Sequence, residues 1–163
     1  MAVVNNITRF LDARHIKYEA FELPAEKLGA LETAHLLNVE ATVVFKTMVV
    51  TREKPRKPLL VVVPGNASVD LKLAAAAVSE KKVYLPTERE AESLTGLQAG
   101  GISPLALINK GFGVLIDFSA RSYPEIHISG GQRGLNIKLS VDDLAKLTNA
   151  RFAAVSKPEP EVA

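Results

Sequence analysis

The chain has 163 residues, of which 47% are hydrophobic and 23% charged, a composition typical of one globular domain. It contains no cysteine, which excludes disulfides, thiolate metal ligands and a cysteine nucleophile. The formal net charge of +2 is far from the strongly basic balance of a dedicated nucleic-acid-binding protein. No apolar run approaches the length of about 20 residues that spans a bilayer, and no signal-peptide pattern is present. We therefore expect a cytoplasmic protein without membrane contact.

The first part of the chain predicts two helices followed by a β-hairpin. Hydrophobic spacing predicts an amphipathic helix over residues 5–14, a short strand over 16–21 and a second helix over 28–37. Two apolar, β-branched runs over 42–50 and 59–63 are joined by a charged turn that contains prolines. These runs predict the two strands of the hairpin.

The rest of the chain predicts further strands and helices around a glycine-rich loop over residues 96–104. We expect helices over 71–78, 88–94 and 141–148, and strands over 83–85, 113–118, 125–128, 135–139 and 152–155. The strands outnumber those of a simple βαβ alternation, so the predicted fold is α+β, with a mixed, strongly curved, barrel-like β-sheet and flanking helices. We predict one domain over residues 1–156 and a disordered tail over 157–163, which is rich in proline and glutamate.

Lys46 lies in the middle of an apolar predicted strand. Because side chains alternate across a strand and both faces of this one are mainly apolar, we expect it to be covered on both sides and the lysine to be largely removed from water. Burial lowers the pKa of a lysine and strengthens its interaction with an anion or a carbonyl oxygen. Lys46 is therefore a candidate site residue. An equally weighted interpretation is a lysine that extends to water or pairs with a structural carboxylate such as Glu22 or Asp117.

Two glycine-rich segments, residues 100–104 and 129–134, allow a ligand to approach the backbone closely. Their amide groups could bind an oxyanion or a phosphate, and the second segment adds a hydroxyl and a guanidinium. Neither segment matches a known nucleotide-binding pattern, and each taken singly is better explained as a tight turn. Basic clusters over 52–57 and 81–82 could contact phosphates, although a solvated turn and a solvated helix end explain them equally well.

The three histidines, His15, His35 and His127, show no metal-ligand spacing, so we predict neither a metal site nor another cofactor. His127 could act as a base, but we prefer a surface-facing position on a strand. Ser103 and Ser129 lack the context of a nucleophile elbow. The sequence therefore gives little support to an acyl-enzyme mechanism.

The segment 45–47 in an apolar strand and the two glycine-rich segments, in this order, resemble the YbaK/EbsC family of aminoacyl-tRNA deacylases over nearly the whole chain. The resemblance implies a barrel-like mixed sheet with flanking helices. It also implies trans-editing, in which mischarged cysteine is removed from tRNA(Pro), because a synthetase pocket cannot strongly reject an amino acid so close to proline in size. The resemblance adds Cys-tRNA(Cys) as a further substrate. The thiol of the substrate is expected to attack its own ester carbonyl, so that the protein supplies no nucleophile.

The resemblance also implies the roles of site residues. Lys46 is expected to hold the terminal phosphate or the ester, and amides around Gly101 and Ile102 to stabilise the oxyanion as the other catalytic groups. Some members carry a carboxylate where this chain has Asn136, and a tyrosine with no counterpart here beyond Tyr18. The expected substrate-binding residues are Phe45, Thr47, Gly100, Ser103, Ser129, Gly130, Gly131, Arg133 and Asn136.

Three other functions remain open at this stage. A sister deacylase would hydrolyse another mischarged tRNA, such as Ala-tRNA(Pro), with a bound water. A non-catalytic module would bind nucleotides or RNA ends through Lys46 and the glycine turns. A Schiff-base enzyme built on Lys46 ranks last. The expected partner is the acceptor 3′ end of a mischarged tRNA, and the resemblance adds prolyl-tRNA synthetase as a second partner that would supply tRNA selectivity.

Overall fold

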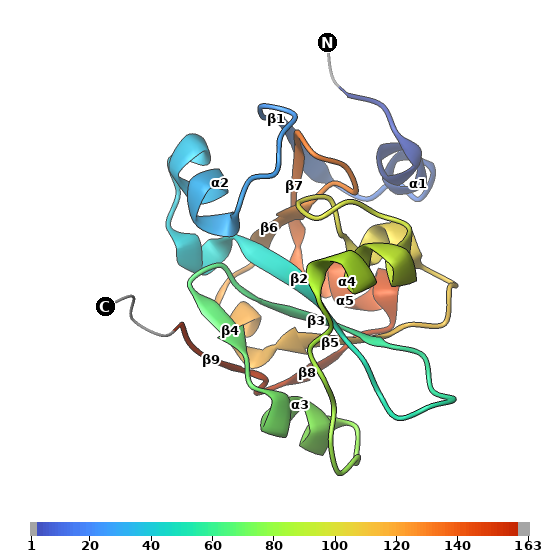
Figure 1. Cartoon of the computed structure of the whole chain (residues 1–163). Coiled ribbons are helices and arrows are strands. Elements are labelled where there is room, and N and C mark those ends of the chain that lie inside the picture. The colour runs from blue at the N-terminus through green and yellow to red at the C-terminus, as the bar shows by residue number, and fades with distance from the viewer. Residues whose placement is uncertain (1–2, 160–163) are drawn as a thin grey trace.

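Figure 1 shows the computed structural model of the chain, which describes residues 3–159. The helices are α1 (Asn6–Ala13), α2 (Ala30–Leu37), α3 (Leu71–Ala77), α4 (Glu88–Thr95) and α5 (Val141–Thr148). The strands are β1 (Tyr18–Glu22), β2 (Phe45–Val50), β3 (Leu59–Pro64), β4 (Ala67–Val69), β5 (Gly113–Asp117), β6 (Glu125–Ser129), β7 (Leu135–Ser140), β8 (Arg151–Ala153) and β9 (Ser156–Pro158). Short 3₁₀ turns cover Ala41–Val43, Pro104–Leu107 and Phe118–Ser122.

The strands form three sheets, which confirms the mixed α+β class. One sheet has the order β1-β7-β6, the second β2-β3-β5-β8, and β4 pairs with β9. The second sheet is mixed, because β2 and β3 are antiparallel whereas β3, β5 and β8 are parallel. An isolated bridge between Val44 and His127 connects the first two sheets. No closed barrel is found within residues 3–159, so the strongly curved, barrel-like part of the prediction is not established.

Most predicted elements are confirmed, and three predictions are wrong in part. The hairpin is present, but residues 42–44 precede its first strand, partly as a 3₁₀ turn, because Val44 bridges to His127 and its carbonyl accepts from Gly65. Tyr84, in the predicted strand 83–85, forms only an isolated bridge to Thr51. Residues 157–158, placed in the disordered tail, belong to β9, since long-range pairing with β4 orders them. The tail residues 160–163 lie outside the described part.

Polar residues fix where the helices begin. Asn5 and Thr8 form a reciprocal capping box at α1, and Thr87 does the same with Glu90 at α4. Ser140 accepts a hydrogen bond from the amide of Asp143, so α5 starts where the sequence predicts. These caps satisfy amide groups that have no partner inside the helix.

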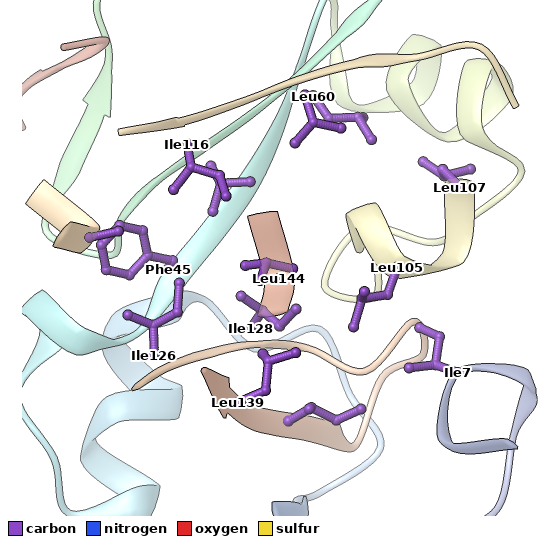
Figure 2. Close-up of a cluster of buried hydrophobic side chains, with 14 of the residues drawn as sticks. Ile7, Phe45, Leu60, Leu105, Leu107, Ile116, Ile126, Ile128, Leu139 and Leu144 are labelled. Atoms are coloured by element: carbon purple, nitrogen blue, oxygen red, sulfur yellow. The ribbon is translucent and has the colours of Figure 1, made fainter. Parts of the chain in front are cut away.

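The main hydrophobic core lies between the two larger sheets, with α1 and α5 packed against it (Figure 2). Phe45 and Val49 of β2 enter this core from one face of the second sheet. On the opposite face Val61 and Val63 pack in a second cluster that includes Ala74 of α3. Strand β3 is therefore buried on both sides, which explains its continuous apolar sequence.

A buried carboxylate holds the end of β5. Asp117 is 4% exposed, and its Oδ1 accepts a hydrogen bond from the amide of Val155 at 3.0 Å. Its Oδ2 accepts from the amide and the hydroxyl of Ser119. Asp117 thus joins β5 to the segment that leads into β9.

We expect Asp117→Ala to lower the free energy of unfolding by about 2–4 kcal/mol, because two backbone amides lose their acceptor. Urea denaturation measures this loss. As a control, Asp70→Ala removes an exposed cap that accepts from the amide of Leu73 and should cost only about 1 kcal/mol. Equal losses for the two variants would contradict the structural role of Asp117.

Candidate functional site

A cavity of about 480 Å³ lies along the outer edge of β2. Residues 26–33, which lead into and begin α2, form one wall, and residues 85–88 at the start of α4 contribute to another. The far side is built by Ala99, Gly100 and Ile102 and by the facing ends of β6 and β7. The cavity therefore gathers segments that are far apart in the sequence around a single strand.

The edge of β2 is open between two bridges, one at Val44 and one at Thr51. Thr51 and Tyr84 exchange both backbone hydrogen bonds, so the peptide groups of Thr51 point away from β3. Because this direction alternates along a strand, the peptide groups of Thr47 and Val49 also point away from β3, toward the cavity. The cavity wall thus offers backbone donors and acceptors that are not used by the sheet.

Lys46 lies in the cavity wall but is less buried than the sequence predicts. Its side chain is 26% exposed, and its Nζ lies 2.7 Å from Oε1 of Glu159, directly after β9. The open edge of β2 explains the exposure. Neither carboxylate suggested by the sequence is the partner, because Asp117 binds backbone amides and Glu22 lies on β1.

Thr47 faces the opposite side of β2 from Lys46. Its Oγ1 is buried and has no hydrogen-bond partner among residues 3–159. A buried hydroxyl without a partner costs free energy, and Thr47 lines the cavity. A polar group of a ligand that reached this oxygen would remove that cost.

His127 and Asn136 form a buried pair behind the cavity, each 4% exposed. His127 Nδ1 lies 2.8 Å from Oδ1 of Asn136, and since an amide oxygen can only accept, the ring proton is on Nδ1. Burial lowers the pKa of His127, so its ring is neutral at neutral pH. The predicted surface-facing position of His127 is therefore wrong. Of the pair, Asn136 reaches the cavity.

The two glycine-rich segments pack against each other. A Cβ at Gly101 would lie 3.0 Å from the Cα of Gln132, a tight contact that would require the facing backbone to shift, so glycine suits this close approach. Arg133 adds a hydrogen bond from Nε to the carbonyl of Ala99 at 2.8 Å. The Gly101 amide itself donates to Gln98 at 2.8 Å, whereas the Ile102 amide makes no hydrogen bond within the described residues. Of the two amides predicted to bind an oxyanion, Ile102 is the one left to do so.

The structure divides the predicted site residues into two groups. Seven of them line the cavity: Phe45, Lys46, Thr47, Gly100, Ile102, Ser129 and Asn136. The others shape its loops and do not line it: Gly101, Ser103, Gly130, Gly131 and Arg133. Ser103, for example, is fully buried, and its hydroxyl accepts from the amide of Leu105 at the start of a 3₁₀ turn.

Sequence reasoning missed several residues of the site. Lys27 and Glu88 form an ion pair of 2.5 Å, and both line the cavity. Glu26 and Glu32 add carboxylates beside α2. Glu159 reaches Lys46 from the far end of the chain. No local motif marks these residues, because folding alone brings their segments together.

The described part of the chain has no helix long and apolar enough to cross a bilayer. Within residues 3–159, His, Cys, Asp and Glu form no group of three or more that could hold a metal ion.

Residues 26–147, which include most of the cavity wall, match the aminoacyl-tRNA editing domain family. This chain belongs to that family. A protein of Enterococcus faecalis (strain ATCC 700802 / V583) named "Putative Cys-tRNA(Pro)/Cys-tRNA(Cys) deacylase EbsC" is 33% identical over 156 residues, 94% of each chain. The predicted likeness to the YbaK/EbsC family of aminoacyl-tRNA deacylases is thus confirmed.

Solved structures agree with this assignment. One described as "Crystal structure of a putative trans-editing enzyme for prolyl tRNA synthetase" superposes with a TM-score of 0.77 at 27% identity, over 95% of this chain and 99% of the other. The crystal structure of hypothetical protein APE2540 superposes with a TM-score of 0.85 at 24% identity, over 94% of this chain and 100% of the other. The second likeness concerns the fold alone.

We expect Asn136→Asp to raise the pKa of His127. A carboxylate at this distance favours the charged ring, whereas burial beside the neutral amide disfavours it. Nuclear magnetic resonance titration of the ring protons measures the change, with the exposed His15 and His35 as internal controls. An unchanged titration of His127 would contradict the direct contact with residue 136.

Proposed function

We propose that this protein removes mischarged cysteine from tRNA(Pro) in trans, with Cys-tRNA(Cys) as a further substrate. The observation that carries the proposal is a cavity with a cation and several polar groups but, within residues 3–159, no nucleophile paired with a base. The hydroxyl of Ser129 accepts from the amide of Gly131, and the Nδ1 proton of His127 is engaged by Asn136. The name of the 33% identical relative supports the same substrate.

In the proposed reaction the substrate supplies the nucleophile. The cysteinyl sulfur attacks the ester carbonyl, a C–S bond forms, and the ester C–O bond breaks. The proton lost by the thiol passes to the released ribose oxygen, and the products are free tRNA and a cyclic thiolactone. Holding sulfur and carbonyl together in a small cavity is the main contribution of the protein, because orientation alone removes much of the barrier.

Each cavity residue has a role in this proposal. Lys46 binds the phosphate of the terminal adenosine or the ester oxygen, and the Ile102 amide donates to the developing oxyanion. Thr47, Ser129 and Asn136 bind the amino acid or the ribose. Their support is that all five line one cavity and that the Thr47 hydroxyl lacks a partner within residues 3–159.

The Lys46–Glu159 ion pair must open for this binding mode. Both side chains are partly exposed, 26% for the lysine and 44% for the glutamate. Exposed ion pairs contribute little free energy, typically about 0–1 kcal/mol, so a phosphate can replace the carboxylate. In this proposal the carboxylate of Glu159 occupies the position of the phosphate and competes with it for Lys46.

The substrate is tested by a deacylation panel with Cys-, Ala- and Ser-charged tRNA(Pro). We expect the cysteine ester to be cleaved, and the serine ester, which has a hydroxyl in place of the thiol, to decay at the rate in buffer. Mass spectrometry should detect the thiolactone. Clearance of Ala-tRNA(Pro) with intact Cys-tRNA(Pro) would instead establish a hydrolytic deacylase of the alanine ester.

The role of Lys46 is tested by two variants that break the same ion pair. We expect Lys46→Ala to lower kcat/KM roughly 10- to 100-fold, since a charge-assisted hydrogen bond contributes about 1.5–3 kcal/mol. Glu159→Gln keeps the cation and removes its competitor, so KM should stay equal or fall. Thermal unfolding checks that both variants fold. An equal loss of activity in both would mean that the pair matters only for structure.

Prolyl-tRNA synthetase is the proposed source of tRNA selectivity. The support is the name of the 27% identical structure, which describes a trans-editing enzyme for that synthetase.

A further inference from the structure

Basic side chains from three segments gather at one end of the molecule, beyond the last residue of β2 and the first residue of β3. This basic end comprises Arg52, Lys54, Arg56, Lys57, Lys81, Lys82 and Lys110. Five of the seven are lysines, and all but Arg52 are exposed. The same segments carry only two carboxylates, Glu53 and Glu80, so their net charge is +5, whereas the whole chain has +2. The rest of the chain is therefore net acidic.

The segments of the basic end are held together by contacts in which both of its carboxylates, Glu53 and Glu80, take part. Glu80, whose side chain is 4% exposed, pairs with both Arg52 and Arg56, and thereby joins the hairpin turn to the residues after α3. Glu53 accepts a hydrogen bond from the hydroxyl of Tyr84 at 2.6 Å.

Two further contacts, one between backbones and one from a side chain to a backbone carbonyl, join these segments. Thr51 and Tyr84 exchange backbone hydrogen bonds, and Lys57 donates to the carbonyl of Lys110 at 2.7 Å. These contacts join the hairpin turn, the residues after α3 and the loop before β5, so the two basic clusters belong to one surface.

The basic end is continuous with the cavity. Lys81 and Lys82 lie only a few residues before Leu85 and Pro86, which line the cavity. In Figure 1 the chain from α3 to α4 runs from this end of the molecule up to α4. At about 3.3 Å per residue, the six steps along the chain from Lys46 in β2 to Arg52 just beyond it span about 20 Å.

We propose that the basic end binds the phosphate backbone of the tRNA acceptor stem while the aminoacyl end occupies the cavity. This inference rests on the proposed function. In this arrangement the unpaired 3′ end follows the interval of about 20 Å between Lys46 and Arg52, and the first duplex phosphates meet the lysines. Phosphate contacts give affinity and orientation but carry no sequence information, so this surface would hold many tRNAs alike.

Direct binding of uncharged tRNA(Pro) transcript tests the surface without any need for catalysis. The test variant is Lys54→Ala/Lys81→Ala/Lys82→Ala. The control variant removes the same number of positive charges from exposed residues of α1, the loop before β1 and α5, and is Arg9→Ala/Lys17→Ala/Lys146→Ala. Fluorescence anisotropy between about 50 and 200 mM salt should show about tenfold weaker binding for the test variant at low salt. The slope of log K for tRNA binding against log salt concentration should become shallower by about one for each lysine that contacts a phosphate.

Activity provides the second readout. On Cys-tRNA(Pro) the test variant should lose about tenfold in kcat/KM through KM, whereas a cysteinyl ester of a short 3′-terminal oligonucleotide without the stem should be cleaved as by the wild type. Equal affinity and equal salt slope in the test and control variants would overturn the inference and leave the deacylase proposal intact. If no charged tRNA is cleaved but the binding loss is seen, the proposed function fails and the surface stands.

Discussion

The open edge of β2 is the constraint on which the site depends. The strand is bridged at Val44 and Thr51 and free between them, so its peptide groups face a cavity instead of another strand. Because side chains alternate along it, one edge presents an ammonium on one face and a hydroxyl on the other. A ligand that contacts both Lys46 and Thr47 must lie across the strand edge. The walls formed by α2, α4 and the glycine-rich loops enclose that edge.

The glycine-rich segments contribute shape more than chemistry. Gly101 lets one loop lie against the backbone of Gln132, and Arg133 ties the two loops through the carbonyl of Ala99. Ile102 is thereby fixed in the cavity wall with its amide unused by other described residues. Residues that the family pattern suggests as substrate contacts can therefore act one step away, by holding the residue that makes the contact.

Local sequence signals predicted what depends on local physics. Ser140 predicted the start of α5, and the continuous apolar, β-branched runs around Lys46 predicted the hairpin. The alternation of side chains along a strand placed Lys46 and Thr47 on opposite faces. Pairings between distant segments carry no such signal. The contact of Lys46 with Glu159 depends on three-residue strands that pair across the chain, and Glu80 joins two basic clusters that look independent in sequence. Tertiary packing likewise leaves the Ile102 amide without a hydrogen bond within the described residues.

The attachment of Glu159 to the protein has a consequence for which anions can bind. An internal carboxylate competes for Lys46 at a constant, high effective concentration, because β9 is paired to β4 and cannot diffuse away. A small anion such as inorganic phosphate or a free nucleotide would have only its contact with Lys46 to displace the carboxylate of Glu159. Under the proposed function, a tRNA end held at further points would meet this competition with several contacts. Occupancy of Lys46 by Glu159 would then filter anions in favour of ligands that are anchored elsewhere.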